Sequence, residues 1–92
     1  MGSTWMLGGY QSGFARSFAR EGLGISDLTR EVTEATLEAV GVSPAEVESV
    51  HVANAFGQLY TGQGHLGAMP ATVVSGLWGV PAMRHEAACA SG

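Results

Sequence analysis

The spacing of apolar residues predicts one long helix in the first half of the chain. Between residues 26 and 40, apolar residues recur at intervals of three and four: Leu28, Val32, Ala35 and Ala39. Charged residues fall between them, which is the pattern of a helix that buries one face. Ser26 is expected to cap the first free amides, and Gly41 to end the helix in a left-handed turn. We therefore predict a helix from residue 26 or 27 to residue 40.

Three short segments have the apolar composition of buried strands. They cover residues 6–10, 49–55 and 82–86. In the second segment, Val50 and Val52 lie on one face, while His51 lies among alanines on the other. Because both faces are nearly apolar, this strand is predicted to be central and His51 to be a packed core residue.

The connecting segments contain further local signals. Residues 11–24 are interpreted as an ordered loop with one helical turn at 15–20, and Ser43 and Glu46 frame a capping box around one short helical turn. Residues 56–67 hold four glycines, and a loop of this length needs a function or a partner to order it. A second helix is predicted from residue 65 or 66 to 75 or 77, despite Pro70, and residues 78–81 end it.

The resulting order is strand, helix, strand, helix, strand, which is typical of the α/β class. The helix before the second strand predicts a parallel crossover. The third strand leads directly to Cys89. Open α/β sheets place their chemistry at the carboxyl ends of strands, so Cys89 is a candidate functional residue.

The composition indicates that part of the apolar surface meets another chain. The chain has 92 residues, of which 46% are hydrophobic and 13% charged, against about a quarter charged in ordinary soluble domains. A chain this short buries only about 60 to 65% of its unfolded surface, so its stability needs additional support. The largest apolar side chains are expected to be core or interface residues: Trp5, Phe14, Phe18, Trp78, with Met69 and Met83 filling gaps in packing.

Charge and residue types exclude several classes of function. The net charge is −4 and the only fixed positive charges are four arginines, which argues against a nucleic-acid partner. No apolar run reaches the roughly 20 residues of a membrane span, and no signal peptide begins the chain, so we expect a cytoplasmic location and no membrane partner. One cysteine and three widely spaced histidines predict neither a disulfide nor a metal site.

Cys89 lies among very small residues, in the sequence Ala87-Ala88-Cys89-Ala90-Ser91-Gly92. If a helix begins at this strand end, its first amides would favour the thiolate and donate to a developing oxyanion. Small neighbours leave room for a substrate. The local chemistry leaves open the alternative of an inert buried thiol.

Three short motifs stand in order along the second half of the chain: Gly62-Gln63-Gly64, Gly79-Val80-Pro81-Ala82 and Ala88-Cys89-Ala90-Ser91-Gly92. Together with the turn at residues 40–47, the strand at 50–55 and the spacing of about ninety residues before the cysteine, their order resembles the thiolase superfamily over nearly the whole chain. Within that family, the likeness is to sterol-carrier-protein-type thiolases and related bacterial acetyl-CoA acetyltransferases.

This resemblance implies a fold. Residues 1–92 would form the N-terminal segment of the thiolase N-terminal domain, a βαβαβ part of a layered α/β thiolase fold with a mixed sheet. The loop domain and the C-terminal half of the family's chain are not in this sequence. The segment is therefore expected to be incomplete on its own.

The resemblance also implies a reaction. Cys89 would take an acyl group from an acyl-CoA thioester, and its backbone N–H would form half of an oxyanion hole. Thiolysis, Claisen condensation and acyl transfer to another acceptor all remain open. Coenzyme A would be a substrate and not a tightly bound cofactor, and no residue is assigned to bind it. The family's catalytic histidines come from downstream motifs that His51, His65 and His85 do not match, so this chain is expected to be inactive alone.

Partners follow from the same resemblance. The expected partners are the remainder of the thiolase chain or a companion polypeptide, a second copy in a homodimer or higher oligomer with residues 62–64 at the contact, and in some family members a small OB-fold protein. Two alternatives to an enzyme remain. One is a non-catalytic thiolase-fold subunit that acts as an interaction module. The other is a redox-sensing thiol, which the absence of a second cysteine disfavours.

Overall fold

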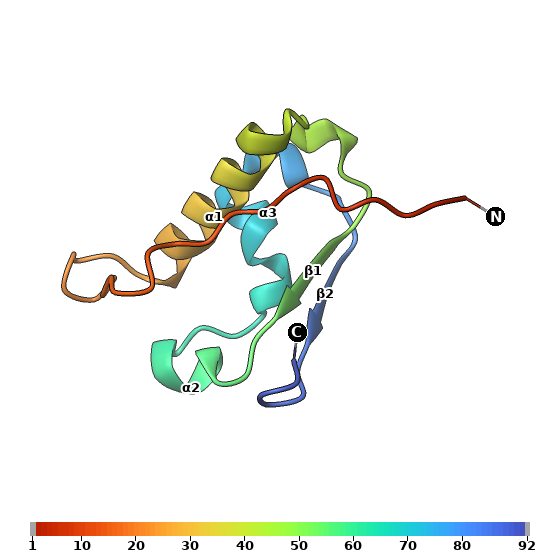
Figure 1. Cartoon of the computed structure of the whole chain (residues 1–92). Helices are drawn as coiled ribbons and strands as arrows, with labels where there is room; N and C mark the ends of the chain where they lie inside the picture. The colour runs from red at the N-terminus through yellow and green to blue at the C-terminus, as the bar shows by residue number, and fades with distance from the viewer. Residues whose placement is uncertain (1, 92) are drawn as a thin grey trace.

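The computed structural model describes residues 2–91, and all of their side chains except those of residues 59 and 60. Helices α1 and α3 lie on one side of the strand pair β1 and β2 (Figure 1). The elements in chain order are α1 Ile25–Val40, η1 Pro44–Glu46, β1 Val50–Ala53, α2 Gly57–Thr61, η2 Leu66–Ala68, α3 Met69–Val73, η3 Ser75–Leu77 and β2 Ala82–His85, where η marks a short 3-10 helix.

Helix α1 confirms the helix predicted from the apolar spacing, with one difference at its start. The helix begins at Ile25, and the capping position is Gly24, whose N–H donates to the Asp27 carboxylate over 2.8 Å. Ser26 lies inside the first turn, so its predicted capping role is wrong. An acidic side chain here also suits the positive end of the helix dipole. At the other end Gly41 adopts the left-handed conformation, with φ 69°, as predicted.

Strands β1 and β2 are parallel, with Val50 opposite Ala82 and Ala53 opposite His85. Val50 and Val52 are half-buried on the side of the helices, while His51 and Ala53 are exposed on the other side. The predicted α/β class and parallel pairing are confirmed. The predicted central position of the second strand and the buried environment of His51 are wrong within residues 2–91, because β1 has β2 as its only neighbour there. A mixed sheet is likewise not formed by these two parallel strands.

The strand predicted at residues 6–10 does not form. These residues lie outside any strand, and Met6 is 95% exposed. A strand is stabilised by hydrogen bonds to a neighbouring strand, and nothing within residues 2–91 pairs with this segment. Its contacts are with α1 instead: the Tyr10 hydroxyl donates to Glu31 over 2.8 Å. Apolar composition without a partner strand was therefore a misleading signal.

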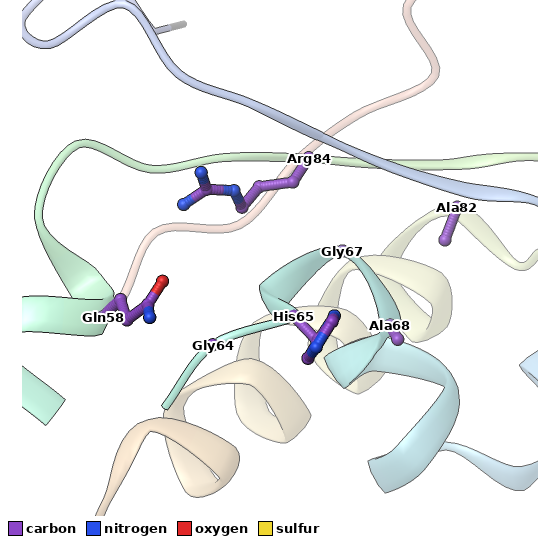
Figure 2. Close-up of a pocket in the computed structure, with 7 residues that line it drawn as sticks. All are labelled: Gln58, Gly64, His65, Gly67, Ala68, Ala82 and Arg84. Atoms are coloured by element: carbon purple, nitrogen blue, oxygen red, sulfur yellow. The ribbon is translucent and has the colours of Figure 1, made fainter. Parts of the chain in front are cut away.

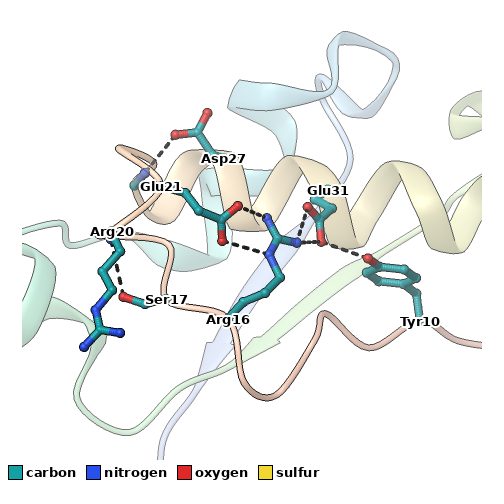
Figure 3. Close-up of polar contacts among 8 residues, drawn as sticks. Tyr10, Arg16, Ser17, Arg20, Glu21, Asp27 and Glu31 are labelled. Atoms are coloured by element: carbon teal, nitrogen blue, oxygen red, sulfur yellow. Dashed lines mark hydrogen bonds and ion pairs between the residues drawn. The ribbon is translucent and has the colours of Figure 1, made fainter.

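The loop at residues 11–24 is ordered mainly by charge. Arg16 forms ion pairs with Glu21 at 2.9 Å and with Glu31 of α1 at 2.8 Å (Figure 3). Its guanidinium carbon also lies 4.2 Å from the centre of the Phe18 ring. The predicted helical turn is displaced to residues 17–23, where the Leu23 N–H donates to the Phe18 carbonyl over 2.8 Å.

The second predicted helix is present as three short pieces. Pro70 lies in the first turn of α3, where its missing N–H costs nothing. Val74 is extended, with φ −123° and ψ 102°, and separates α3 from η3. The loop predicted at residues 56–67 contains the short helix α2. The short helical turn predicted after Ser43 is confirmed as η1, and Ser43 caps it by accepting from the Ala45 N–H over 3.3 Å. Within residues 2–91 the Glu46 side chain forms no hydrogen bond back to Ser43, so the predicted capping box is only half formed.

The buried centre lies between α3, η3 and the strands. The fully buried apolar side chains are Leu66, Met69 and Leu77. Gly67 allows η2 to pack directly on β2, since a Cβ atom there would lie 3.1 Å from the backbone nitrogen of Arg84. By contrast, no residue of α1 is fully buried, and an open groove of about 540 Å³ separates α1 from β1.

Much apolar surface remains exposed. Trp5 is 80%, Phe14 96% and Trp78 76% exposed, so the expectation that they pack in a core is wrong for this chain, and the expectation of an interface stays a prediction. No helix within residues 2–91 is long and apolar enough to cross a membrane.

Candidate active site

Strand β2 places Cys89 where the sequence predicts it, just beyond the carboxyl end of a strand. Ala53 and His85 lie opposite each other in the register, so β1 and β2 end at the same edge of the sheet. The chain then turns through residues 86–91, with Cys89 exposed and its thiol free. The alternative of a buried thiol does not hold in this structure.

Hydrogen bonds within the turn fix the backbone on both sides of Cys89. The Ala90 N–H donates to the Ala87 carbonyl over 2.9 Å, and the Ser91 N–H donates to the Ala88 carbonyl over 3.1 Å. The Ser91 hydroxyl closes the turn: it accepts from the Ala87 N–H at 2.9 Å and donates to the Ala88 carbonyl at 2.7 Å. Ser91 therefore positions the segment that carries the thiol.

The residue before the thiol is strained. Ala88 has φ 48°, in the left-handed region that a residue with a Cβ rarely adopts. The Ala88 N–H donates to the Glu86 carboxylate over 2.5 Å, which helps to hold this conformation. Strain of this kind is found at sites where the chain must present a side chain in one direction. Here it presents Cys89.

The helix expected to begin beside Cys89 is not present in residues 87–91, which form successive turns. The amides of Ala90 and Ser91 donate to carbonyls of the same turn. In this arrangement they do not face the thiol as free donors. The activation of the thiol by a helix start therefore has no support within residues 87–91 and stays a prediction, and Gly92 lies outside the described residues.

Two histidines form a pair that the sequence did not predict. His51 of β1 and His85 of β2 approach with Nδ1 and Nε2 2.9 Å apart. The ring centres are 5.1 Å apart and the planes differ by 21°. If the two rings meet edge to edge in one plane, the distance between their centres equals the N···N distance plus the distance from each nitrogen to its own ring centre. The observed distance between the centres is close to that sum. The contact is therefore an in-plane hydrogen bond, in which one of the two nitrogens donates its proton to the other.

The pair changes how both histidines are interpreted. His51 is exposed and bonded to His85, and not packed in a core as predicted. Both residues lie on the face of the sheet away from the helices. Their spacing in the sequence gave no signal, because only the strand register shows that they meet. The two imidazoles form a hydrogen bond with each other, and within residues 2–91 neither of them forms a hydrogen bond with Cys89.

The third histidine lines an open cavity of about 660 Å³ that is bordered by residues of α2, η2 and β2. His65 precedes η2 and has φ 51° and ψ 41°, again the left-handed region. Figure 2 shows the lining residues, which are Gln58, Gly64, His65, Gly67, Ala68, Ala82 and Arg84. Within residues 2–91 no group of three or more His, Cys, Asp or Glu side chains could hold a metal ion.

Comparison with known proteins identifies one relationship. The family model described as "Thiolase, N-terminal domain" matches residues 10–92. The match covers α1, both strands and the turn of Cys89. A search of curated proteins finds no match.

Proposed function

The chain belongs to the thiolase family of acyltransferases, and from this premise we propose that Cys89 is the nucleophile of an acyl transfer from an acyl-CoA thioester. The observation that carries this proposal is the exposed thiol in a strained turn of small residues at the carboxyl end of β2. An exposed thiol at this position is accessible to a thioester and can attack its carbonyl carbon.

The proposed step exchanges one thioester for another. The Cys89 sulfur forms a bond to the acyl carbonyl carbon, the bond between that carbon and the coenzyme A sulfur breaks, and coenzyme A leaves as its thiol with the proton that Cys89 gives up. The acyl group then passes to an acceptor. Thiolysis, Claisen condensation and transfer to another nucleophile differ only in that second step, and no residue of this chain favours one of them.

The proposed reaction needs groups beyond those described here. His51 and His85 form a hydrogen bond with each other, and His65 lines a cavity that Cys89 does not line. We therefore assign the catalytic base to the remainder of a thiolase chain or to a companion polypeptide, and expect this chain alone to be inactive. The exposed Trp5, Phe14 and Trp78 supply apolar surface for such a partner.

The assembly and location remain proposals of the same kind. A homodimer or higher oligomer with residues 62–64 at the contact is proposed from the resemblance, and the exposed side chain of Phe56, in the same loop segment, agrees with it. A small OB-fold partner and a cytoplasmic location are carried over from the resemblance alone. Coenzyme A is proposed as a substrate and not as a resident cofactor.

A second function has one observation in its favour. The amides of Ala90 and Ser91 are used within the turn, as expected for a subunit that keeps the fold and its contact surfaces but has an unreactive cysteine. This interaction module would bind partner chains through its exposed apolar side chains and would form no acyl adduct.

Intact-mass spectrometry separates the two functions. The native sample, with any companion chain retained, is incubated with acetyl-CoA and longer acyl-CoA thioesters and then mapped by peptide digestion. We expect an acyl group on the peptide that contains Cys89, and none in the Cys89→Ser variant. The Ser12→Ala variant is the matched control. It removes a hydroxyl group distant from Cys89 and should carry the same acyl group on the peptide that contains Cys89. An acyl group absent from the wild-type peptide would instead support the interaction module.

A further inference from the structure

The cavity beside β2 is lined by hydrogen-bond donors and by no carboxylate. Arg84 projects from β2, Gln58 from α2, and His65 from the segment before η2 (Figure 2). The other lining residues are alanines and glycines. Three polar side chains from three different elements therefore surround one space, and the fixed charge among them is positive.

Arg84 has no acidic partner among residues 2–91, although acidic residues outnumber basic ones in this chain. The sequence holds eight acidic residues and four basic ones. Arg16 and Arg30 pair with glutamates, while no carboxylate of residues 2–91 lies within ion-pair distance of Arg20 or Arg84. A guanidinium presents several donors in a plane and recognises carboxylate or phosphate oxygens. At Arg84 this group borders a cavity and is left available to a ligand.

The backbone of His65 supports a binding role. A residue with a Cβ in the left-handed region is strained, and glycine would fit there more easily. The chain has glycine at positions 62, 64 and 67 nearby, yet a histidine occupies the strained position. In this conformation the imidazole lies at the wall of the cavity, where its N–H can serve a ligand.

We propose that this cavity binds a phosphate group through Arg84, His65 and Gln58. Donors that border the cavity from three elements suit the tetrahedral oxygens of phosphate better than the two coplanar oxygens of a carboxylate. The phosphate comes either from coenzyme A, in which case this inference rests on the proposed function, or from a free phosphate ion. The cavity volume of about 660 Å³ accommodates either.

The test is a titration with inorganic phosphate, followed by NMR of the backbone amides in a buffer free of other oxyanions. Saturable shifts are expected for residues 64–68 and 82–84. Arg84→Gln is expected to weaken binding about tenfold or more, as the loss of a charge-assisted contact. Arg20→Gln is the matched control: it removes the same charge from another arginine without an acidic partner, outside the cavity and directed away from the nearby carboxylates (Figure 3). It should leave binding unchanged.

A second variant distinguishes the loss of a phosphate contact from the loss of the fold. His65→Gly removes the imidazole and relieves the left-handed strain, so it should weaken phosphate binding while the chain unfolds at an equal or higher temperature. Shifts that do not saturate, or equal binding in wild type and Arg84→Gln, would overturn the proposal. Competition by coenzyme A would assign the phosphate to the substrate, and its absence to a free ion. Cys89→Ser should bind phosphate normally, so this test is independent of the acyl-transfer test.

Discussion

The two faces of the β1 and β2 sheet differ in what covers them. On one face, Val50 and Val52 are half-buried and Gly67 brings η2 against the backbone of β2. On the other face, the side chains of His51 and His85 form an exposed hydrogen bond with each other, and Met83 is 55% exposed. Packing therefore stabilises the first face, while polar contacts hold the second. Strand β2 continues into the turn of Cys89.

This difference teaches that the packing that stabilises the sheet lies on one face, while the turn of Cys89 lies beyond the ends of the strands. Core packing contributes several kcal/mol per large apolar side chain, whereas exposed hydrogen bonds contribute about 1 kcal/mol. The chain can vary the exposed face and the turn beyond it with small effects on folding. Substitutions on the two faces should show this contrast directly.

The largest effect is expected at Leu77, which is 2% exposed beneath the helical face. Leu77→Ala should lower the free energy of unfolding by about 2 to 5 kcal/mol, because it leaves a cavity in the small buried centre. Urea unfolding followed by circular dichroism measures the change. Leu7→Ala removes the same atoms from a side chain that is 71% exposed, and should cost less than about 0.5 kcal/mol. Equal losses in the two variants would contradict the assigned core.

A smaller effect is expected where η2 meets β2. Gly67→Ala would place a Cβ atom 3.1 Å from the backbone of Met83 and Arg84, and backbone atoms cannot move aside as a side chain can. Overpacking of this kind costs about 1 to 3 kcal/mol. Gly9→Ala is the control, because a Cβ there meets nothing within 4 Å. If Gly67→Ala unfolds at the same urea concentration as wild type, the close approach is not present in solution.

The sequence predicted the elements of the helical face well, and physical reasons explain where it failed. Helix α1 and strand β2 were predicted almost to the residue, because their signals are local: a regular apolar spacing, a glycine at the helix end, and a proline before the strand. Residues 6–10 failed because a strand depends on a neighbour that no local pattern reports. The second helix was predicted despite Pro70, whose place in the first turn of α3 only the structure shows, and the break at Val74 had no local signal.

The site was predicted in position but not in its surroundings. Cys89 and its place after β2 followed from the chain order. The His51 and His85 pair did not, because two residues 34 positions apart meet only through the strand register. The strain at Ala88 and His65 was also not predictable, since alanine and histidine carry no preference for the left-handed conformation of the kind that glycine has.

The exposed histidine pair should contribute about 0.5 to 1.5 kcal/mol, the range of a single intramolecular hydrogen bond. A double-mutant cycle of His51→Ala and His85→Ala isolates this term, because each single change removes the same contact. Urea unfolding of the four proteins gives the coupling energy. A coupling energy near zero would mean that the two rings do not meet in solution. The exposed face would then lack the hydrogen bond assigned to it.

The smallest effect concerns the charge cluster that ties the N-terminal loop to α1, and it appears only in the pH dependence. The hydrogen bonds from Arg16, and for Glu31 also from Tyr10, lower the pKa of Glu21 and Glu31 from the ordinary value of 4.5. A carboxyl group whose pKa is lower in the folded state stabilises the fold above its ordinary pKa, and this contribution is lost as pH falls through the lowered pKa. All these groups are exposed, so solvent screening keeps the effect small. Arg16→Gln should therefore be slightly less stable than wild type near neutral pH, and this difference should shrink at acidic pH, as the pH falls below the ordinary carboxyl pKa of 4.5. Arg30→Gln, whose contact with Glu34 at 3.7 Å is looser, is the control and should show little change at either pH. A constant difference between Arg16→Gln and wild type across this range would show that Arg16 acts through its packing on Phe18 and not through the carboxylates.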